Sequence, residues 1–225
     1  MTSNSKGRTN KARGEETREK LVEVGLRMFA MNGFNGVSMR NLAAEAEVNL
    51  ATVGYHFGGK QGLYDAILRE IIAFRDEVMP GMDAVQAQLE LYEAGKRSRQ
   101  ELVSWFFRGL MLGMLNNPAS LWGVMLINRE LAAPSESYRM LDEEFFDPSI
   151  NAMNLLLKAV MPAETSFTEI MAVGTALVGI ALKFVNPKAF TDRVGWDEMT
   201  PGRIEEVTEI LCRRAAAFVC CQEAY

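Results

Sequence analysis

The spacing of apolar residues is the feature that most restricts how this chain can fold. Apolar side chains recur at helical intervals through long stretches of Leu, Ala, Met and Glu, whereas runs of Val, Ile and Thr at a spacing of two are few. Only seven prolines interrupt the 225 residues. We therefore expect an all-α protein, and the 48% content of hydrophobic residues is enough to build a core.

Charge is distributed unevenly along the chain, whose net charge is −5. The first 14 residues contain four basic residues and no acidic one: Lys6, Arg8, Lys11 and Arg13. Residues 1–65 hold nine basic and seven acidic residues, whereas the remainder holds 15 basic and 22 acidic residues. The surface as a whole is therefore unsuited to indiscriminate nucleic-acid binding, and contact with DNA is expected near the N-terminus.

The cysteines and the apolar stretches indicate a reducing compartment and no membrane span. Cys212, Cys220 and Cys221 are odd in number, lie at one end and follow no signal peptide, so we expect structural thiols in a cytoplasmic protein. The most apolar long stretch, residues 171–185, contains Lys183 and is shorter than the ~20 residues that a membrane-spanning helix needs. We expect it to be a buried or interface helix.

Capping and turn residues divide the chain into elements and domains. We expect a disordered basic arm at 1–14, a DNA-binding domain at 15–65 and a larger helical domain at 66–225. Pro148 should kink or split the helix in which it falls. The helices are expected at about 16–32, 38–46, 50–57, 60–78, 83–94, 98–116, 119–131, 135–159, 166–185 and 202–221.

The first three of these helices have the order and lengths of a helix-turn-helix, which places its second helix in the major groove of DNA. Here that helix is Leu50–Phe57. The residues around it resemble the DNA-binding signature of the TetR family over positions 16–68. The resemblance is carried by Leu42-Ala43, Val48, Val53, Tyr55-His56-Phe57-Gly58-Gly59-Lys60 and Leu63-Tyr64.

The resemblance and side-chain chemistry together give candidate DNA contacts. By resemblance, Tyr55, His56 and Lys60 are phosphate contacts, which set affinity without reading sequence, and Ser38 is a further candidate phosphate contact. Four residues could read bases, because Arg suits guanine, apolar groups suit the thymine methyl and Thr reaches either a base or a phosphate: Arg40, Leu50, Ala51 and Thr52. Whether the basic arm enters a minor groove or is simply solvated remains open.

Two positions depart from the family pattern. Glu47 stands in the turn where glycine is usual, and a left-handed backbone there costs on the order of 1 kcal/mol. Gly54 lies inside the reading helix, where relatives often carry a side chain that touches DNA. Either the backbone approaches DNA closely at Gly54 or one contact is missing.

The sequence gives little support for an enzyme. Residues 54–60 match the first positions of a phosphate loop, but Gln61 follows in place of Ser or Thr and no strand precedes them. His56 is the single histidine, so a histidine-based metal cluster or catalytic triad is excluded. We expect no cofactor, no metal and no enzyme. An architectural DNA-binding protein is a further alternative, which the acidic C-terminal half disfavours.

The C-terminal half is larger than a DNA-binding module needs, and it resembles the CerR or CecR branch of the family over residues 122–148 and 176–196. The resemblance implies a small-molecule effector. Candidate pocket residues are Trp105, Met111, Met114, Met125, Asn128, Arg129 and Met153. Ordinary core packing is the alternative for the methionines, and a structural pair between Arg129 and a carboxylate is the alternative for the polar residues.

Two helices, 166–185 and 202–221, carry small and apolar residues that would suit the four-helix dimer interface of the family. The expected interface residues are Gly174, Leu177, Val178, Ala181, Leu211, Ala215 and Phe218. A homodimer would bind double-stranded operator DNA of pseudo-palindromic sequence and leave it when an effector binds. Repression is expected, although the residues leave activation open.

Overall fold

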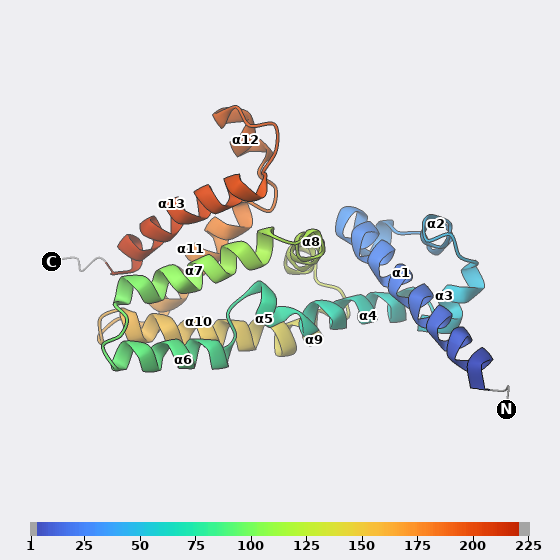
Figure 1. The fold of residues 1–225 in the computed structure, drawn as a ribbon, viewed down its shortest axis with the longest axis horizontal. Helices are drawn as coiled ribbons and strands as arrows, with labels where there is room; N and C mark the ends of the chain where they lie inside the picture. The colour runs from blue at the N-terminus through green and yellow to red at the C-terminus, as the bar shows by residue number, and fades with distance from the viewer. Residues whose placement is uncertain (1–3, 221–225) are drawn as a thin grey trace. The chain divides into compact units, whose positions relative to one another are not determined.

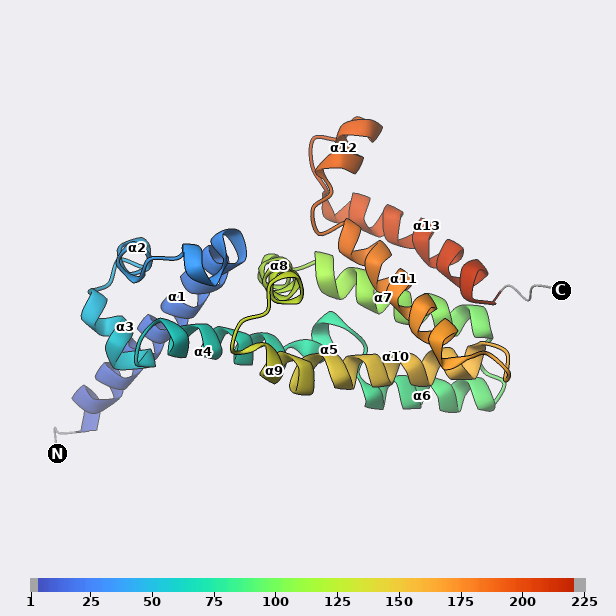
Figure 2. The same ribbon diagram turned by 180° about the vertical axis from the view of Figure 1, so that it is seen from behind.

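The computed structural model describes residues 4–220, with side chains from Ala12 onward, and contains no strand in that range (Figures 1 and 2). The helices form two compact units. The first consists of the residues up to Ala73 together with Trp122–Arg139, and the second of Phe74–Leu121 together with the chain from Met140 onward. The chain therefore passes from one unit to the other three times, and the all-α prediction is confirmed.

The first unit contains the helix-turn-helix and a segment from the middle of the chain. Its helices are α1 (Asn4–Gly36), α2 (Met39–Glu45), α3 (Leu50–Phe57), α4 (Lys60–Ala73) and the later turns of α8 (Pro118–Ala132). The first unit extends to Ala73, eight residues past the predicted boundary at 65/66, because α4 continues to bury Leu68 and Ile71 beyond that point. The prediction also missed that residues 122–139 fold with the N-terminal helices.

α1 begins earlier than expected. We predicted a disordered arm over 1–14, but the helix starts at Asn4. Residues 11–20 are rich in Lys, Ala, Arg and Glu, which favour helix, so α1 extends further toward the N-terminus than expected. The first three residues lie outside the described part of the chain. Near its other end α1 is interrupted at Gly33, whose φ of 72° and ψ of 170° are not helical.

The core of the first unit joins α1, α2, α3 and α4. Its fully buried side chains include Leu21, Phe29, Leu42, Val53, Leu63, Tyr64, Ile67 and Leu68. Each such aliphatic or aromatic side chain contributes roughly 1.5–3 kcal/mol when removed from water. α1 and α4 approach closely at Gly25, where an added Cβ would lie 2.7 Å from Cδ1 of Ile67. This packing fixes the short helices α2 and α3 against two longer ones.

The second unit is a bundle in which α7 packs along α13 and α10 lies beside α6 and α11. Its elements are α5 (Arg75–Val78), α6 (Met82–Glu93), α7 (Arg99–Leu115), the start of α8, the end of α9 (Tyr138–Leu141), the π-helix η1 (Asp142–Phe146), α10 (Asp147–Val160), α11 (Phe167–Lys183), α12 (Lys188–Val194) and α13 (Pro201–Cys220). Cys212 is buried between α7 and α13, where burial raises the pKa of its thiol, in keeping with a structural role. Cys221 lies outside the described residues.

Two details of the helices differ from the prediction, and a third agrees with it. The helix expected over 60–78 breaks at Phe74 into α4 and α5. The segment 135–159 splits as Pro148 predicted, because Pro148 falls in the first turn of α10, directly after the π-helix. α12 was not predicted; it starts after Pro187 and ends at Gly195, which adopts a left-handed φ of 72°.

No single helix among residues 4–220 is both long and apolar enough to cross a membrane. Two sharply bent helix pairs, α7 with α8 and α11 with α12, satisfy the criteria of length and composition when each pair is taken together.

Candidate nucleic-acid interface

The turn before α3 uses a left-handed glutamate where glycine would be the unstrained choice. Glu47 has a φ of 55°, as its position in the turn predicted. Lys20 of α1 donates a hydrogen bond to the Glu47 carboxylate at 2.8 Å, and this contact holds the pKa of Glu47 below its usual value. Arg27 and Glu45 form a second ion pair between α1 and α2 at 2.5 Å. The turn therefore keeps its shape through a contact with α1.

α3 has a cap at each end, which is why its predicted bounds were correct. The side chain of Asn49 accepts a hydrogen bond from the amide of Ala51 at 2.9 Å. Gly58 closes the helix with a φ of 71° and donates its amide to the carbonyl of Gly54 at 2.9 Å. Val53 is buried and anchors the helix, so the opposite face is turned outward.

The predicted base-reading residues lie at the surface of the first unit. Leu50 is 46% exposed, so its side chain is available to contact a thymine methyl group. Ala51 and Arg40 are exposed, and Thr52 is half-buried. All four are thus accessible to DNA in the unbound protein.

Three of the four predicted phosphate contacts lie at the end of α3 and the start of α4. Tyr55 is 86% exposed, and its ring lies edge-on to that of His56 with centroids 5.2 Å apart. Lys60 lies over the ring of Phe34, 4.7 Å from its centroid, which orients the ammonium group. Ser38 occupies the N-cap position of α2, but its side chain makes no capping hydrogen bond and is exposed.

Gly54 opens the reading face to close approach. A Cβ added at Gly54 would meet no atom within 4 Å, so the protein leaves this backbone uncovered. Of the two explanations that the sequence left open, this surface suits an approach of another backbone, such as that of DNA.

Comparison with known proteins identifies this arrangement. Residues 21–67 match the family described as "Bacterial regulatory proteins, tetR family". Residues 99–219, more than half of the chain, match "HTH-type transcriptional dual regulator CecR, C-terminal domain". The chain belongs to the TetR family of transcriptional regulators. The regulator is 25% identical over 201 residues to the HTH-type transcriptional dual regulator CecR of Shigella flexneri, an alignment that covers 88% of this chain and 87% of that protein.

Solved structures show the same fold. HlyIIR, a hemolysin II transcriptional regulator, superimposes with a TM-score of 0.61 at 18% identity, covering 93% of this chain and 99% of that one. AibR, solved in complex with isovaleryl coenzyme A and operator DNA, gives a TM-score of 0.62 at 12% identity, covering 87% and 96% of the two chains. The regulator therefore combines an N-terminal DNA-binding unit with the helical C-terminal region of this family.

The structure divides the candidate effector residues between the two units. Trp105, Met111, Met114 and Met153 belong to the second unit, and Met125, Asn128 and Arg129 to the first. Met111, Met114 and Met153 are buried, as the core-packing alternative expects, and Trp105 is half-buried. Asn128 is exposed. The seven residues therefore do not form one cluster within either unit.

The structure gives Arg129 partners other than the carboxylate that the structural alternative expected: its guanidinium donates to the backbone carbonyls of Ala30 and Met31. Glu130 is 2% exposed and accepts a hydrogen bond from the hydroxyl of Tyr64. Polar residues inside an apolar helix were the available signal, whereas their partners lie 66 to 99 positions away along the chain.

The candidate interface helices are present, but several predicted residues face inward. Leu177, Ala181 and Ala215 are buried within the protomer, and Gly174 lies against Met153 and Leu157 of α10. These four offer little side-chain surface to a second copy, so their assignment to the interface needs correction. Val178 and Leu211 are half-buried, and Phe218 is 54% exposed.

Proposed function

We propose that the protein is a homodimeric repressor that binds a pseudo-palindromic operator and leaves it when a small-molecule effector binds. The exposed face of α3 carries this proposal. A helix that presents Leu50, Tyr55 and an uncovered Gly54 backbone to solvent has the shape and chemistry of a major-groove reader. We expect a cytoplasmic protein because it would act on DNA, and we expect no enzymatic activity, since the relatives it matches are transcriptional regulators.

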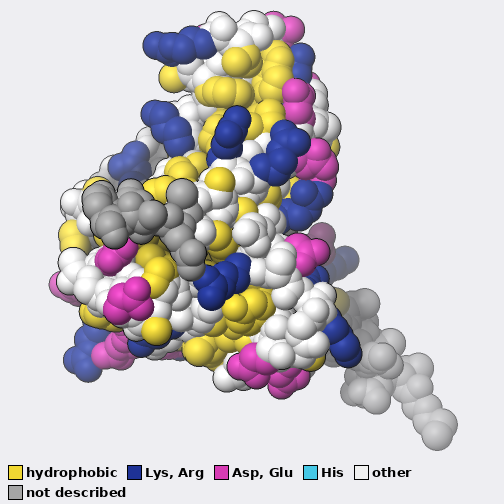
Figure 3. Space-filling model, turned by 90° about the vertical axis from the view of Figure 1, so that its left-hand side faces the viewer, with side chains coloured by type: hydrophobic (Ala, Val, Ile, Leu, Met, Phe, Trp, Pro, Cys, Tyr) yellow, Lys and Arg dark blue, Asp and Glu magenta, His cyan; other side chains and the backbone are white. Residues whose placement is uncertain are grey.

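A dimer is supported by the outward faces of α11 and α13. On α11 the exposed residues at helical spacing are small, which allows close approach of another helix: Ala172, Thr175, Ala176 and Gly179. On α13 the exposed side chains include Ile210, which is 43% exposed, Ala217 and Phe218. Figure 3 shows hydrophobic side chains running between lysines and arginines on a side of the second unit. We propose that these residues, with Val178 and Leu211, form the interface.

Such a dimer would place two α3 helices in successive major grooves, about 34 Å apart. The symmetry of the dimer would then require an inverted repeat in the operator.

An effector site in the second unit is supported by buried polar atoms without partners. Three of them belong to Ser149, Asn154 and Thr208, which are 7%, 7% and 0% exposed. Buried polar atoms in proteins are normally hydrogen-bonded, so an effector that supplies donors would be favoured here. The described buried polar residues of this unit are all neutral, so we propose a largely apolar, uncharged effector. For AibR the bound molecule is isovaleryl coenzyme A.

Selection of bound sequences from a random pool of double-stranded DNA tests the proposal. The wild type should enrich a palindromic site. At fixed salt, Arg40→Ala should relax the preference at the contacted base by about 1–3 kcal/mol, whereas Tyr55→Phe should weaken binding to all sequences equally. Leu131→Ala, at a 48% exposed position of α8, is the control and should leave the selection unchanged.

The outcomes separate the alternatives. An enriched site without symmetry would contradict the dimeric reading. Binding without enrichment would indicate an architectural protein, and no binding at all would overturn the proposal.

A further inference from the structure

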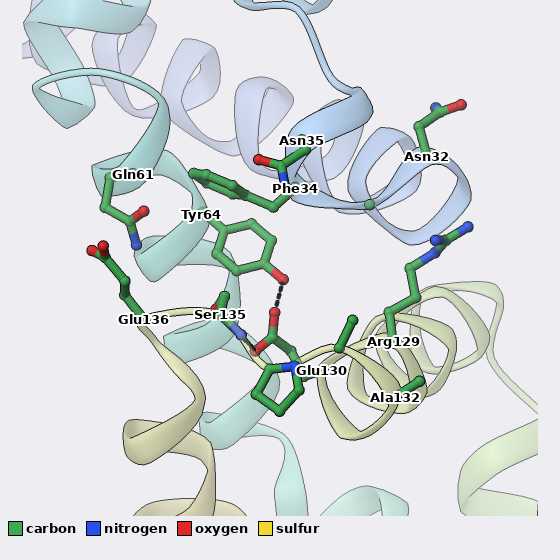
Figure 4. Close-up of a pocket in the computed structure, with 13 residues that line it drawn as sticks. Asn32, Phe34, Asn35, Gln61, Tyr64, Arg129, Glu130, Ala132, Ser135 and Glu136 are labelled. Carbon is green, nitrogen blue, oxygen red and sulfur yellow. Dashed lines mark hydrogen bonds between the residues drawn. The ribbon is translucent and has the colours of Figure 1, made fainter.

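The last turns of α8 and the residues that follow it pack against the helix-turn-helix. Gly123 lies beside Ile71 of α4, where an added Cβ would come within 3.5 Å of Cγ1. Four polar side chains further along, Arg129, Glu130, Ser135 and Ser137, make hydrogen bonds to α1, to α4 or to each other. We call these four residues the α8 clamp. Figure 4 shows most of them around a pocket of about 590 Å³, with Tyr64 and Phe34 on the opposite wall.

Arg129 holds the end of the straight part of α1. Its Nε donates to the carbonyl oxygen of Ala30 at 2.8 Å, and its Nη2 donates to that of Met31 at 2.5 Å. The non-helical backbone at Gly33 interrupts α1 just beyond these residues, and the last carbonyls of a helix need donors from outside it. The planar guanidinium supplies two donors in a fixed orientation, and its positive charge faces the negative end of the helix dipole.

Glu130 holds the first turn of α4. The hydroxyl of Tyr64 donates to Oε1 at 2.5 Å, while the amide and hydroxyl of Ser135 donate to Oε2 at 3.1 and 2.9 Å. Burial and the neighbouring carboxylate raise the pKa of Tyr64 well above its usual value. The Tyr64 ring also packs edge-on against Phe29 and Phe34, each at 4.9 Å between centroids. A buried carboxylate with three donors is stable where it stands and costly to displace.

Ser137 makes the third attachment, also to α4. Its hydroxyl donates to Oδ1 of Asp65 at 2.6 Å and accepts from Nε2 of Gln61 at 2.8 Å, and Ser137 is 7% exposed. Gln61 directly follows Lys60, and Tyr64 lies four residues after Lys60. The clamp therefore grips the same helical turn that carries a candidate phosphate contact.

α8 connects the α8 clamp to the second unit, because this helix begins in the second unit and ends in the first. α4 also leads out of the DNA-binding unit, since the chain enters the second unit at Phe74. We infer that Arg129 and Glu130 are positioning residues for operator binding: by holding α1 and the first turn of α4, they fix the orientation of α3 on each half-site and hence the half-site spacing that the dimer accepts. This inference rests on the proposed dimeric repressor.

The spacing of half-sites provides the test. Binding of full-length wild type, Arg129→Ala, Arg129→Lys and Leu131→Ala is measured by fluorescence anisotropy at fixed salt. The DNA is the selected operator and versions with the half-sites one base pair closer or further apart. Arg129→Ala should lose about tenfold in its preference for the natural spacing, since the end of α1 is no longer held, and Arg129→Lys should lose part of it. Leu131→Ala, at a 48% exposed position of α8, should behave as the wild type.

A purely structural role for Arg129 predicts something else, namely equal weakening on every spacing with a lower melting temperature; that result, or an unchanged spacing preference, overturns the inference. If Arg129→Ala does not fold, Arg129→Lys decides, because it keeps the charge and one donor group. If the wild type selects no palindromic site, the proposed function fails and the inference fails as well. If the wild type prefers one spacing and the variants share this preference, only the inference is refuted.

Discussion

Two glycines near the reading face have opposite surroundings. At Gly54 a side chain would meet nothing, whereas at Gly62, in the first turn of α4, an added Cβ would overlap the carbonyl oxygen of Phe57. The first glycine is therefore not required by the fold of the protein, and the second is. Gly62 is needed for the turn between α3 and α4, whereas Gly54 is free for the close approach of DNA that we propose.

Alanine at each position should show the difference. Gly54→Ala should stabilise the protein by up to ~1 kcal/mol through helix propensity. It should also weaken operator binding about tenfold, because a methyl group would stand where DNA approaches. Gly62→Ala should destabilise by roughly 1–3 kcal/mol, because the backbone must move. Thermal denaturation and anisotropy measure the two effects, and tight operator binding by Gly54→Ala would contradict the close approach.

The carboxamide oxygen of Asn154 is buried in the second unit without a hydrogen-bond partner. Asn154 donates to the sulfur of Met171 at 3.4 Å, but its Oδ1 has no partner. Asn154→Leu should therefore raise the stability of the effector-free protein by about 1 kcal/mol or more, since an unsatisfied buried group is removed. Chemical denaturation measures this change. Asn151→Leu, at an exposed position of α10, serves as the control; a loss of stability in Asn154→Leu would count against an effector-facing role.

At the scale of helices, local signals predicted most of the fold. α3 was placed correctly because Asn49 and Gly58 cap it, and α7 was placed closely because Ser98 starts it. α12 was missed although Pro187 and Gly195 flank it, since a seven-residue helix gives little periodicity to detect. The grouping of α8 with α1 and α4 could not be predicted, because it depends on contacts between residues 66 to 99 positions apart.

Two serines at helix starts should behave in opposite ways. Ser98 accepts a hydrogen bond from the amide of Glu101 and forms a capping box with it, so Ser98→Ala should cost about 1 kcal/mol of stability and leave DNA affinity unchanged. Ser38 makes no capping bond, so Ser38→Ala should hardly alter stability but should weaken binding to all DNA sequences. Melting curves and salt-dependent binding test the pair, and a large loss of stability in Ser38→Ala would argue for a capping role instead.

At the scale of the whole molecule, the proposed dimer depends on residues that one chain leaves exposed. The proposal rests on the same pair of helices that the sequence indicated, but helical periodicity alone does not say which apolar face a protomer uses for its own core. Burial of Leu177 and Ala181 and exposure of Ile210 and Phe218 separate the two faces.

A charge on the outward face of α13 should therefore prevent dimer formation. Phe218→Glu should give monomers in light-scattering chromatography and lose binding to the full operator, because the two reading helices are no longer linked. Val194→Glu, at a 44% exposed position of α12, is the matched control and should remain dimeric. A dimeric Phe218→Glu protein with normal affinity would place the interface elsewhere.

The discontinuous first unit has a consequence for protein engineering. A fusion that exchanges DNA specificity between two regulators would most simply be made by cutting the chain after the N-terminal helices. In this chain such a cut would leave Tyr64 without Glu130 and the carbonyls of Ala30 and Met31 without Arg129. A working graft would have to transfer residues 122–139 together with the first 73, so that two separated stretches of gene move as one part.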